Sequence, residues 1–272
     1  MIDYILDIAF DDDDEELVQS RLFLTQCTGS VAVEATLLSA YFDSAEDRDA
    51  AMELLREYGL RAYEREREDW LEHYEQSLEP LLIGGSFIVA PDARLIPPDT
   101  ARHALVVPQE QAFGTGSHET TSLCIEILES MDVAGTRGLD VGAGSGILAL
   151  AMLRLGAAKV IAFDNDADAY GALRDNRIRN GVDAERMPLF IGGVEALRGG
   201  RFDVVTMNII PEVILPLLGD VVARVGHTLI LSGILIDRAA EVVRACENHG
   251  LRLAEERKKG EWWAGSFRIP EP

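Results

Sequence analysis

The segment RGLDVGAGSGILALAMLRLGA, residues 137–157, constrains the fold of this chain more than any other stretch. An apolar run of strand length passes through Gly142, Gly144 and Gly146 into an apolar run of helix length. Glycines permit a tight turn and let a ligand approach the backbone, while the first amide groups of the helix stay available. A Gly-x-Gly alone is weak evidence, but this context predicts a ligand-binding strand–turn–helix unit.

The same alternation of strand and helix continues to residue 250. Its strand patterns are rich in apolar and β-branched residues and lie at 159–166, 188–192, 202–208 and 227–234. Its helical patterns lie at 167–181, 211–226 and 237–250. The expected fold class is therefore α/β, a doubly wound, mostly parallel, Rossmann-like sheet of seven strands. Residues 251–269 predict a β-hairpin that adds an antiparallel strand in or beside this sheet.

Residues 1–66 predict a separate, small α+β domain. Strand and helix patterns follow one another there in the order β-α-β-β-α-β, which is that of a ferredoxin-like fold. A Ser-x-x-Asp form of the capping box at Ser44 predicts the start of the second helix. Residues 67–111 predict a linker, with a helix around 70–78 and then short extended pieces broken by prolines and glycines. Residues 112–272 are the expected cofactor-binding domain.

The charge of the chain distinguishes between classes of partner. The net charge is −22, and residues 1–70 carry 19 Asp and Glu against 6 Arg and no Lys. An acidic surface repels nucleic-acid phosphates and speeds the encounter with a basic protein. We therefore expect a basic protein partner and no direct nucleic-acid substrate. The alternative is that the acidity only maintains solubility.

The sequence contains no pattern typical of export, membrane insertion or metal binding. No apolar run is long enough to span a bilayer, and the first ten residues include acidic residues where a signal peptide has basic ones. Cys27, Cys124 and Cys246 are few, odd in number and far apart, which favours a reducing cytosol over disulfides or structural zinc. We expect a cytoplasmic protein without a metal site.

The spacing of the glycines distinguishes between cofactors. A dinucleotide site usually has Gly-x-Gly-x-x-Gly, whereas this turn has Gly-x-Gly-x-Gly with Asp140 two positions before the first glycine. This version resembles the class I S-adenosylmethionine-dependent methyltransferases and favours a methyl-donor site over a nicotinamide site. Asp164 ends the next strand, where a carboxylate accepts both ribose hydroxyls. The alternative for Asp164 is a helix N-cap, a role also open to Asn165, Asp166 and Asp168.

Asn208 ends the strand pattern FDVVTMN, at the carboxyl edge of the sheet where open α/β folds bind ligands. Its side-chain oxygen can accept a hydrogen bond from an amine. DNA and glutamine-amide methyltransferases carry Asn/Asp-Pro-Pro-Tyr/Phe at this point. Here Ile209 and Ile210 stand in place of the two prolines, which disfavours a planar base or amide as substrate. The alternative for Asn208 is a cap for the helix that begins near Pro211.

A second glycine-rich stretch, AFGTGSHETT at residues 112–121, precedes a helix and has no hydrophobic period. Together with LDVGAGSGILAL, MNII, LILSGIL and EWW, it closely resembles the ribosomal protein L11 methyltransferases. These bacterial enzymes methylate lysine ε-amines, and the N-terminal amine, of that large-subunit protein. The resemblance runs from about residue 68 to Trp263, and over residues 1–66 it is only architectural.

The resemblance implies a cofactor, a substrate and a set of site residues. The cofactor is S-adenosylmethionine, and the substrate is protein L11, gripped by the small N-terminal domain. The implied cofactor contacts, all in the motifs quoted above, are Thr121, Gly142, Gly144, Gly146, Asp164 and Asn208. It also implies that the loop at 112–121 folds over the cofactor and that the protein is a monomer.

We hypothesise that Asn208 and the hydroxyl groups of residues 115–121 orient the substrate amine. His118 is not assigned as a general base, because a histidine in a loop is as often a structural hydrogen-bonding residue. The family often has Cys, Ala and Leu at the positions of Ala143, Met207 and Ile210, and Met207 leaves the choice of substrate open. Two alternatives remain: a methyltransferase for another protein or a small amine, and a non-catalytic module that binds a basic partner.

Overall fold

The computed structural model describes residues 2–11, 14–34, 36–66, 79–108 and 118–270. They belong to two compact units, Met1–His73 and Tyr74–Pro272. The helix expected around residues 70–78, and most of the loop 112–121, lie outside the described residues. Within the described ranges, no helix is both long and apolar enough to cross a membrane.

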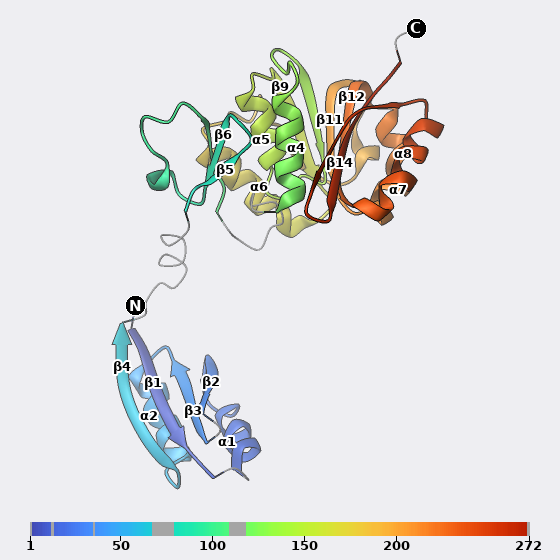
Figure 1. Cartoon of the computed structure of the whole chain (residues 1–272). Helices are drawn as coiled ribbons and strands as arrows, with labels where there is room; N and C mark the ends of the chain where they lie inside the picture. The colour runs from blue at the N-terminus through green and yellow to red at the C-terminus, as the bar shows by residue number, and fades with distance from the viewer. Residues whose placement is uncertain (1, 12–13, 35, 67–78, 109–117, 271–272) are drawn as a thin grey trace. The chain divides into compact units, whose positions relative to one another are not determined.

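The described residues of the N-terminal unit form a four-stranded antiparallel sheet and two helices (Figure 1). Its elements are β1 (Ile2–Ala9), α1 (Glu15–Leu22), β2 (Gly29–Glu34), β3 (Leu37–Phe42), α2 (Ala45–Leu54) and β4 (Gly59–Glu66). The strand order is β2-β3-β1-β4. Leu6, Ile8, Leu38 and Phe42 form the centre of its core. The helix start predicted at Ser44 is confirmed, because its hydroxyl accepts from the backbone N–H of Asp47, three positions on, at 3.1 Å.

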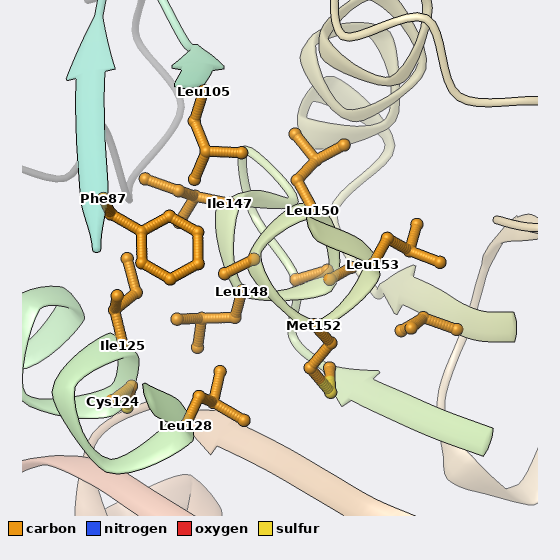
Figure 2. Packing of buried hydrophobic residues seen from close by; sticks show 14 of the residues in the cluster. Phe87, Leu105, Cys124, Ile125, Leu128, Ile147, Leu148, Leu150, Met152 and Leu153 are labelled. Atoms are coloured by element: carbon orange, nitrogen blue, oxygen red, sulfur yellow. The ribbon is translucent and has the colours of Figure 1, made fainter. Parts of the chain in front are cut away.

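The Tyr74–Pro272 unit begins with a small sheet that the sequence suggested only as extended pieces. It has the strand order β5-β6-β7 and consists of β5 (Leu81–Ile83), β6 (Phe87–Ala90) and β7 (His103–Val106), with the 3-10 helix η2 (Ala93–Leu95) before β7. On β5, Leu81 and Leu82 are exposed, whereas Ile83 and all four residues of β6 are buried. Phe87 and Leu105 pack against helices α4 (Glu119–Glu129) and α5 (Ile147–Arg154) in one continuous core (Figure 2).

The larger sheet confirms the predicted doubly wound, mostly parallel arrangement. Its strands are β8 (Arg137–Val141), β9 (Lys159–Asp164), β10 (Leu189–Ile191), β11 (Phe202–Asn208), β12 (Val225–Leu235), β13 (Arg252–Lys259) and β14 (Trp262–Arg268), in the order β10-β9-β8-β11-β12-β14-β13. The first five are parallel to one another, whereas β14 is antiparallel to both β12 and β13. The predicted hairpin therefore inserts its second strand into the sheet.

Helices cover both faces of this sheet (Figure 1). With α4 and α5, helix α6 (Ala167–Arg179) covers one face, and α7 (Pro211–Val222) and α8 (Ala239–Asn248) cover the other. Successive side chains of a strand point to opposite faces of the sheet. On β11, Val204 therefore packs in the core under α4, α5 and α6, whereas Val205 and Met207 pack in the core under α7 and α8. Asn208 comes next in this alternation, on the α4 side at the carboxyl end of the strand.

Two short 3-10 helices, η3 (Val194–Ala196) and η4 (Ile236–Arg238), complete the elements of this unit.

Candidate functional site

A cavity of about 400 Å³ lies at the carboxyl ends of β8, β9 and β11. This volume is in the range of small-molecule sites, and the position is where open α/β sheets bind ligands. Of the residues predicted as cofactor contacts, five line it: Thr121, Gly142, Gly144, Asp164 and Asn208. Gly146, the sixth, does not line the cavity. The fold thus brings together residues that are far apart in the sequence.

The three glycines of the strand-to-helix turn all have positive φ, 65° at Gly142, 51° at Gly144 and 78° at Gly146. Their surroundings nevertheless differ. A Cβ at Gly142 would lie 2.3 Å from Cδ1 of Ile209, at the cavity wall. A Cβ at Gly146 would lie 2.4 Å from Cδ1 of Leu173, where α5 packs against α6. The first two glycines therefore shape the cavity, while Gly146 permits close helix packing beneath it.

Asp164 ends β9 and faces this turn. Its Oδ2 accepts from the backbone N–H of Gly144 at 2.9 Å, and its Oδ1 accepts from that of Asp166 at 3.0 Å. Asp166, not Asp164, is the N-cap of α6, because its carboxylate accepts from the N–H of Asp168 at 2.9 Å. Since each carboxylate oxygen has two lone pairs, Asp164 keeps capacity to accept from a ligand in the cavity.

Asn208 and Thr121 meet at the opposite wall. The Nδ2 of Asn208 donates to Oγ1 of Thr121 at 3.4 Å. The Oδ1 of Asn208 is buried and accepts no hydrogen bond from the described residues. The cap alternative for Asn208 is wrong, since Ile210 is the N-cap of α7 and Pro211 is its first residue. An orphaned acceptor costs free energy in the folded protein, which makes it a candidate ligand contact.

Asp140 also lines the cavity, from the end of β8. Its carboxyl group accepts from Oγ1 of Thr206 at 2.7 Å and from the backbone N–H of Ala149 at 3.1 Å. The pKa of Asp140 is raised to about 7, chiefly by burial and to a smaller extent by the charge of Asp164, although the two hydrogen bonds act in the opposite direction. The carboxyl group therefore changes charge near neutral pH.

His118 has the structural role expected from the sequence. It is the N-cap of α4, and its Nδ1 lies 2.8 Å from Oγ1 of Thr120. Its ring also contacts that of Trp262 edge-on, with the centroids 4.8 Å apart. Both rings line the cavity. The hydroxyl groups at residues 115–117, which the sequence linked to amine orientation, lie outside the described residues.

Sequence reasoning missed the side chains that close the cavity, chiefly Trp262 and Ile209. Trp262 was visible only as part of the family-like EWW motif. Ile209 is held between two glycines: besides the contact at Gly142, a Cβ at Gly233 would lie 2.5 Å from its carbonyl oxygen. Gly233 has φ 81° and stands where the pairing of β12 with β14 shifts register. A glycine inside a strand pattern was the available signal for this close approach.

Cys124 lies on α4, the helix that also carries Thr121. Burial raises its pKa to about 12. The thiol therefore stays protonated at neutral pH and is not a nucleophile.

Comparison with known proteins places this geometry in a family. Residues 6–269 match the family model described as ribosomal protein L11 methyltransferase (PrmA). A ribosomal protein L11 methyltransferase of Geobacter metallireducens is 40% identical over 197 residues, which cover 72% of this chain and 64% of that protein. A protein of the same name from Pelobacter propionicus is 36% identical over 259 residues, 85% of this chain and 81% of its own length.

A solved structure has a similar fold. The crystal structure of a ribosomal protein L11 methylase from Lactobacillus delbrueckii subsp. bulgaricus superposes with a TM-score of 0.66 at 24% identity, over 71% of this chain and 100% of that one. The match with the Geobacter protein spans just under two thirds of that protein's length. Because the family match extends over nearly the whole sequence, this chain belongs to the ribosomal protein L11 methyltransferase family.

Proposed function

We propose that this protein transfers methyl groups from S-adenosylmethionine to amines of ribosomal protein L11, namely lysine ε-amines and the N-terminal α-amine. Family membership supports the reaction class, and the names of the relatives support the substrate. Because ribosomal proteins are located in the cytoplasm, we also propose a cytoplasmic location for this enzyme.

The charge of the cavity is the observation that carries the choice of cofactor. Among the described residues, its lining contains two carboxylates, Asp140 and Asp164, and no Lys or Arg. This environment attracts a positively charged sulfonium and repels the pyrophosphate of a dinucleotide. We infer that Asp164 binds the ribose hydroxyls, that the turn at Gly142 and Gly144 lies against the cofactor, and that Thr121 contacts it. Gly146 does not contact the cofactor in this proposal but lets the turn pack closely against α6.

The substrate amine must be neutral before it attacks. A lysine ammonium has a pKa of ~10.4 in water, and entry into a largely apolar cavity lowers it, so that the proton leaves to solvent. When bound, S-adenosylmethionine supplies a methyl group on a positively charged sulfur. The orphaned Oδ1 of Asn208 accepts an N–H of the amine and orients its lone pair. The amine would take the methyl group from the bound cofactor, which would leave as a neutral thioether, and the positive charge would pass from sulfur to nitrogen.

We further propose that residues 1–66 form a ferredoxin-like domain that recognises the substrate, joined by the segment 67–111 to the methyltransferase domain 112–272. The order β-α-β-β-α-β and the antiparallel strand order β2-β3-β1-β4 support the fold. The excess of Asp and Glu in this region supports a basic protein as its partner.

The test is a methyl-transfer assay with purified protein, radiolabelled S-adenosylmethionine and purified L11, followed by mass spectrometry of the product. Methyl groups on lysines or on the N-terminal amine of L11 are the expected result. Transfer to another protein of a cell extract, or to a small amine, but not to L11, would overturn the substrate. Cofactor binding without transfer to any acceptor would support the alternative of a non-catalytic binding module.

A further inference from the structure

Two asparagines at the end of α6 are buried although neither touches the cavity. Asn176 is 3% exposed and Asn180, the C-cap residue of the helix, is 6% exposed. Buried carboxamides are retained where their hydrogen bonds are satisfied. Their hydrogen-bond partners belong to two other segments, strand β7 and the glycine turn at residues 142–146.

Asn180 pairs with strand β7 as a neighbouring strand would. Its Oδ1 accepts from the backbone N–H of Val106 at 2.9 Å, and its Nδ2 donates to the carbonyl of the same residue at 2.8 Å. The carbonyl oxygen of Asn180 accepts from Nη2 of Arg154, in the last turn of α5, at 3.0 Å. The end of β7 is thereby attached to α5 and α6.

Asn176 continues this connection to the glycine turn. The Nδ2 of Asn180 also donates to the backbone carbonyl of Asn176 at 2.8 Å. The Nδ2 of Asn176 in turn donates to the carbonyl of Ser145 at 3.0 Å. Ser145 is the residue between Gly144 and Gly146. An unbroken series of hydrogen bonds therefore runs from β7 to the turn that shapes the cavity.

The glycine turn needs such support because three of its five residues are glycines. Glycine loses more conformational freedom on ordering than any other residue, so a ligand that binds a loose turn must compensate for ordering it. A hydrogen bond to the buried carbonyl of Ser145 orders the turn in advance.

We propose that Asn176 and Asn180 are positioning residues that fix the glycine turn to strand β7 and so set the affinity for the cofactor. The inference rests on the proposed function, because it takes the glycine turn as the cofactor site. It assigns the two asparagines to binding and not to the chemical step, so their loss weakens cofactor binding while turnover at saturating cofactor persists.

The test compares Asn176→Asp and Asn180→Asp with Asn248→Asp in the full chain. Each aspartate keeps the shape and the acceptor but removes the donor, and places a carboxylate beside the carbonyl of Ser145 or Val106. Asn248 is the matched control, since it also ends a helix but is exposed. Titration calorimetry with S-adenosylhomocysteine should give a Kd about tenfold higher for the first two variants, the equivalent of one good hydrogen bond. The control should change less than about twofold.

Two further measurements separate positioning from a general loss of structure. The KM for S-adenosylmethionine should rise while kcat stays within about twofold. Hydrogen exchange of the cofactor-free variants should be faster in a peptide spanning residues 142–148 than in the wild-type protein. If an aspartate variant does not fold, Asn180→Ala, which buries no charge, replaces it in the same measurements.

Folded variants with unchanged Kd and unchanged exchange would overturn the inference, as would a fall in kcat with unchanged KM. A wild-type protein that does not bind S-adenosylhomocysteine would instead refute the proposed function. The exchange of residues 142–148 would still report whether the asparagines hold the turn.

Discussion

Asn208 lines the cavity, and no described donor satisfies its buried carboxamide oxygen. If this oxygen orients the substrate amine, Asn208→Ala should lower turnover by roughly a hundredfold, because misplacement of a reacting group has effects of that size. The Kd for S-adenosylhomocysteine should change only a few-fold, since the carboxylates and the glycine turn remain. Single-turnover rates with L11 check the first expectation and calorimetry the second. Thr121→Ser, which keeps the hydroxyl contact, is the control, and near-normal turnover of Asn208→Ala would remove it from the mechanism.

Asp140 makes the stability of the cofactor-free protein depend on pH. Burial raises its pKa from 3.8 to about 7, so the folded state holds the proton more tightly than the unfolded chain does. Its contribution to stability is fully present below about pH 4 and is lost as the pH rises through about 7.

Asp140→Asn should remove this dependence. Between about pH 4 and pH 7, the free energy of unfolding of the wild-type protein relative to the variant should fall by up to ~1.4 kcal/mol per pH unit. Urea unfolding at several pH values measures the difference. Parallel pH profiles for the two proteins would show that Asp140 is already charged in the folded state.

At the scale of elements, helix α4 connects the small sheet to the rest of its unit. Glu129, near its end, accepts from the backbone N–H groups of Gly85 and Ser86 at 3.0 and 2.7 Å, and from the Ser86 hydroxyl at 2.5 Å. It therefore holds the turn between β5 and β6 through three hydrogen bonds.

Glu129→Ala should destabilise the protein by about 1–3 kcal/mol, because three hydrogen bonds to a charged acceptor are lost. Among the described residues, Glu126, three residues earlier on the same helix, makes long ion pairs with Arg257 and Lys259, at 3.6 and 3.8 Å. Glu126→Ala should therefore change the stability by less than ~1 kcal/mol. Urea denaturation of both variants tests the contrast, and equal losses would contradict the role assigned to Glu129.

The elements that the sequence predicted well are those with a strong local period. The strand-and-helix alternation of residues 137–250 and the hairpin after it need no distant contact to be recognised. The strands β5, β6 and β7 are only three or four residues long, too short to show a period, and they form because Phe87 and Leu105 complete a core with α4 and α5.

In the candidate site, too, the residues that belong to clear local patterns were predictable from the sequence. Asp164 and Asn208 end clear strands, and parallel topology brings such ends together. The contacts of Ile209 with Gly142 and Gly233, and the pairing of Asn180 with Val106, join residues distant in sequence without a local motif. They depend on how the elements pack, which the order of residues along the chain does not reveal.

At the scale of the whole molecule, the acidic N-terminal region should control how fast the substrate arrives. We expect kcat/KM for L11 to fall several-fold when salt is raised from about 0.05 to 0.5 M, while kcat stays nearly constant, because screening affects encounter more than chemistry.

Neutralising three exposed acids of the N-terminal unit should make this salt dependence shallower. These are Asp11, Glu15 and Glu34. The matched control neutralises three exposed acids of the other unit, Glu185, Asp220 and Glu247. Steady-state kinetics over a salt series compare the two triple variants, and equal slopes would exclude a special role for the N-terminal charges.

The insertion of β14 between β12 and β13 also dictates when the site forms during synthesis. Chains leave the ribosome N-terminus first, at ~5–20 residues per second, so residues 2–66 emerge long before the hairpin. Until β14 arrives, β12 lacks the neighbour that follows it in the sheet, and the cavity lacks Trp262. A nascent chain therefore carries the acidic unit without a complete pocket, and the cavity gains its full lining only once residues 262–268 have been translated.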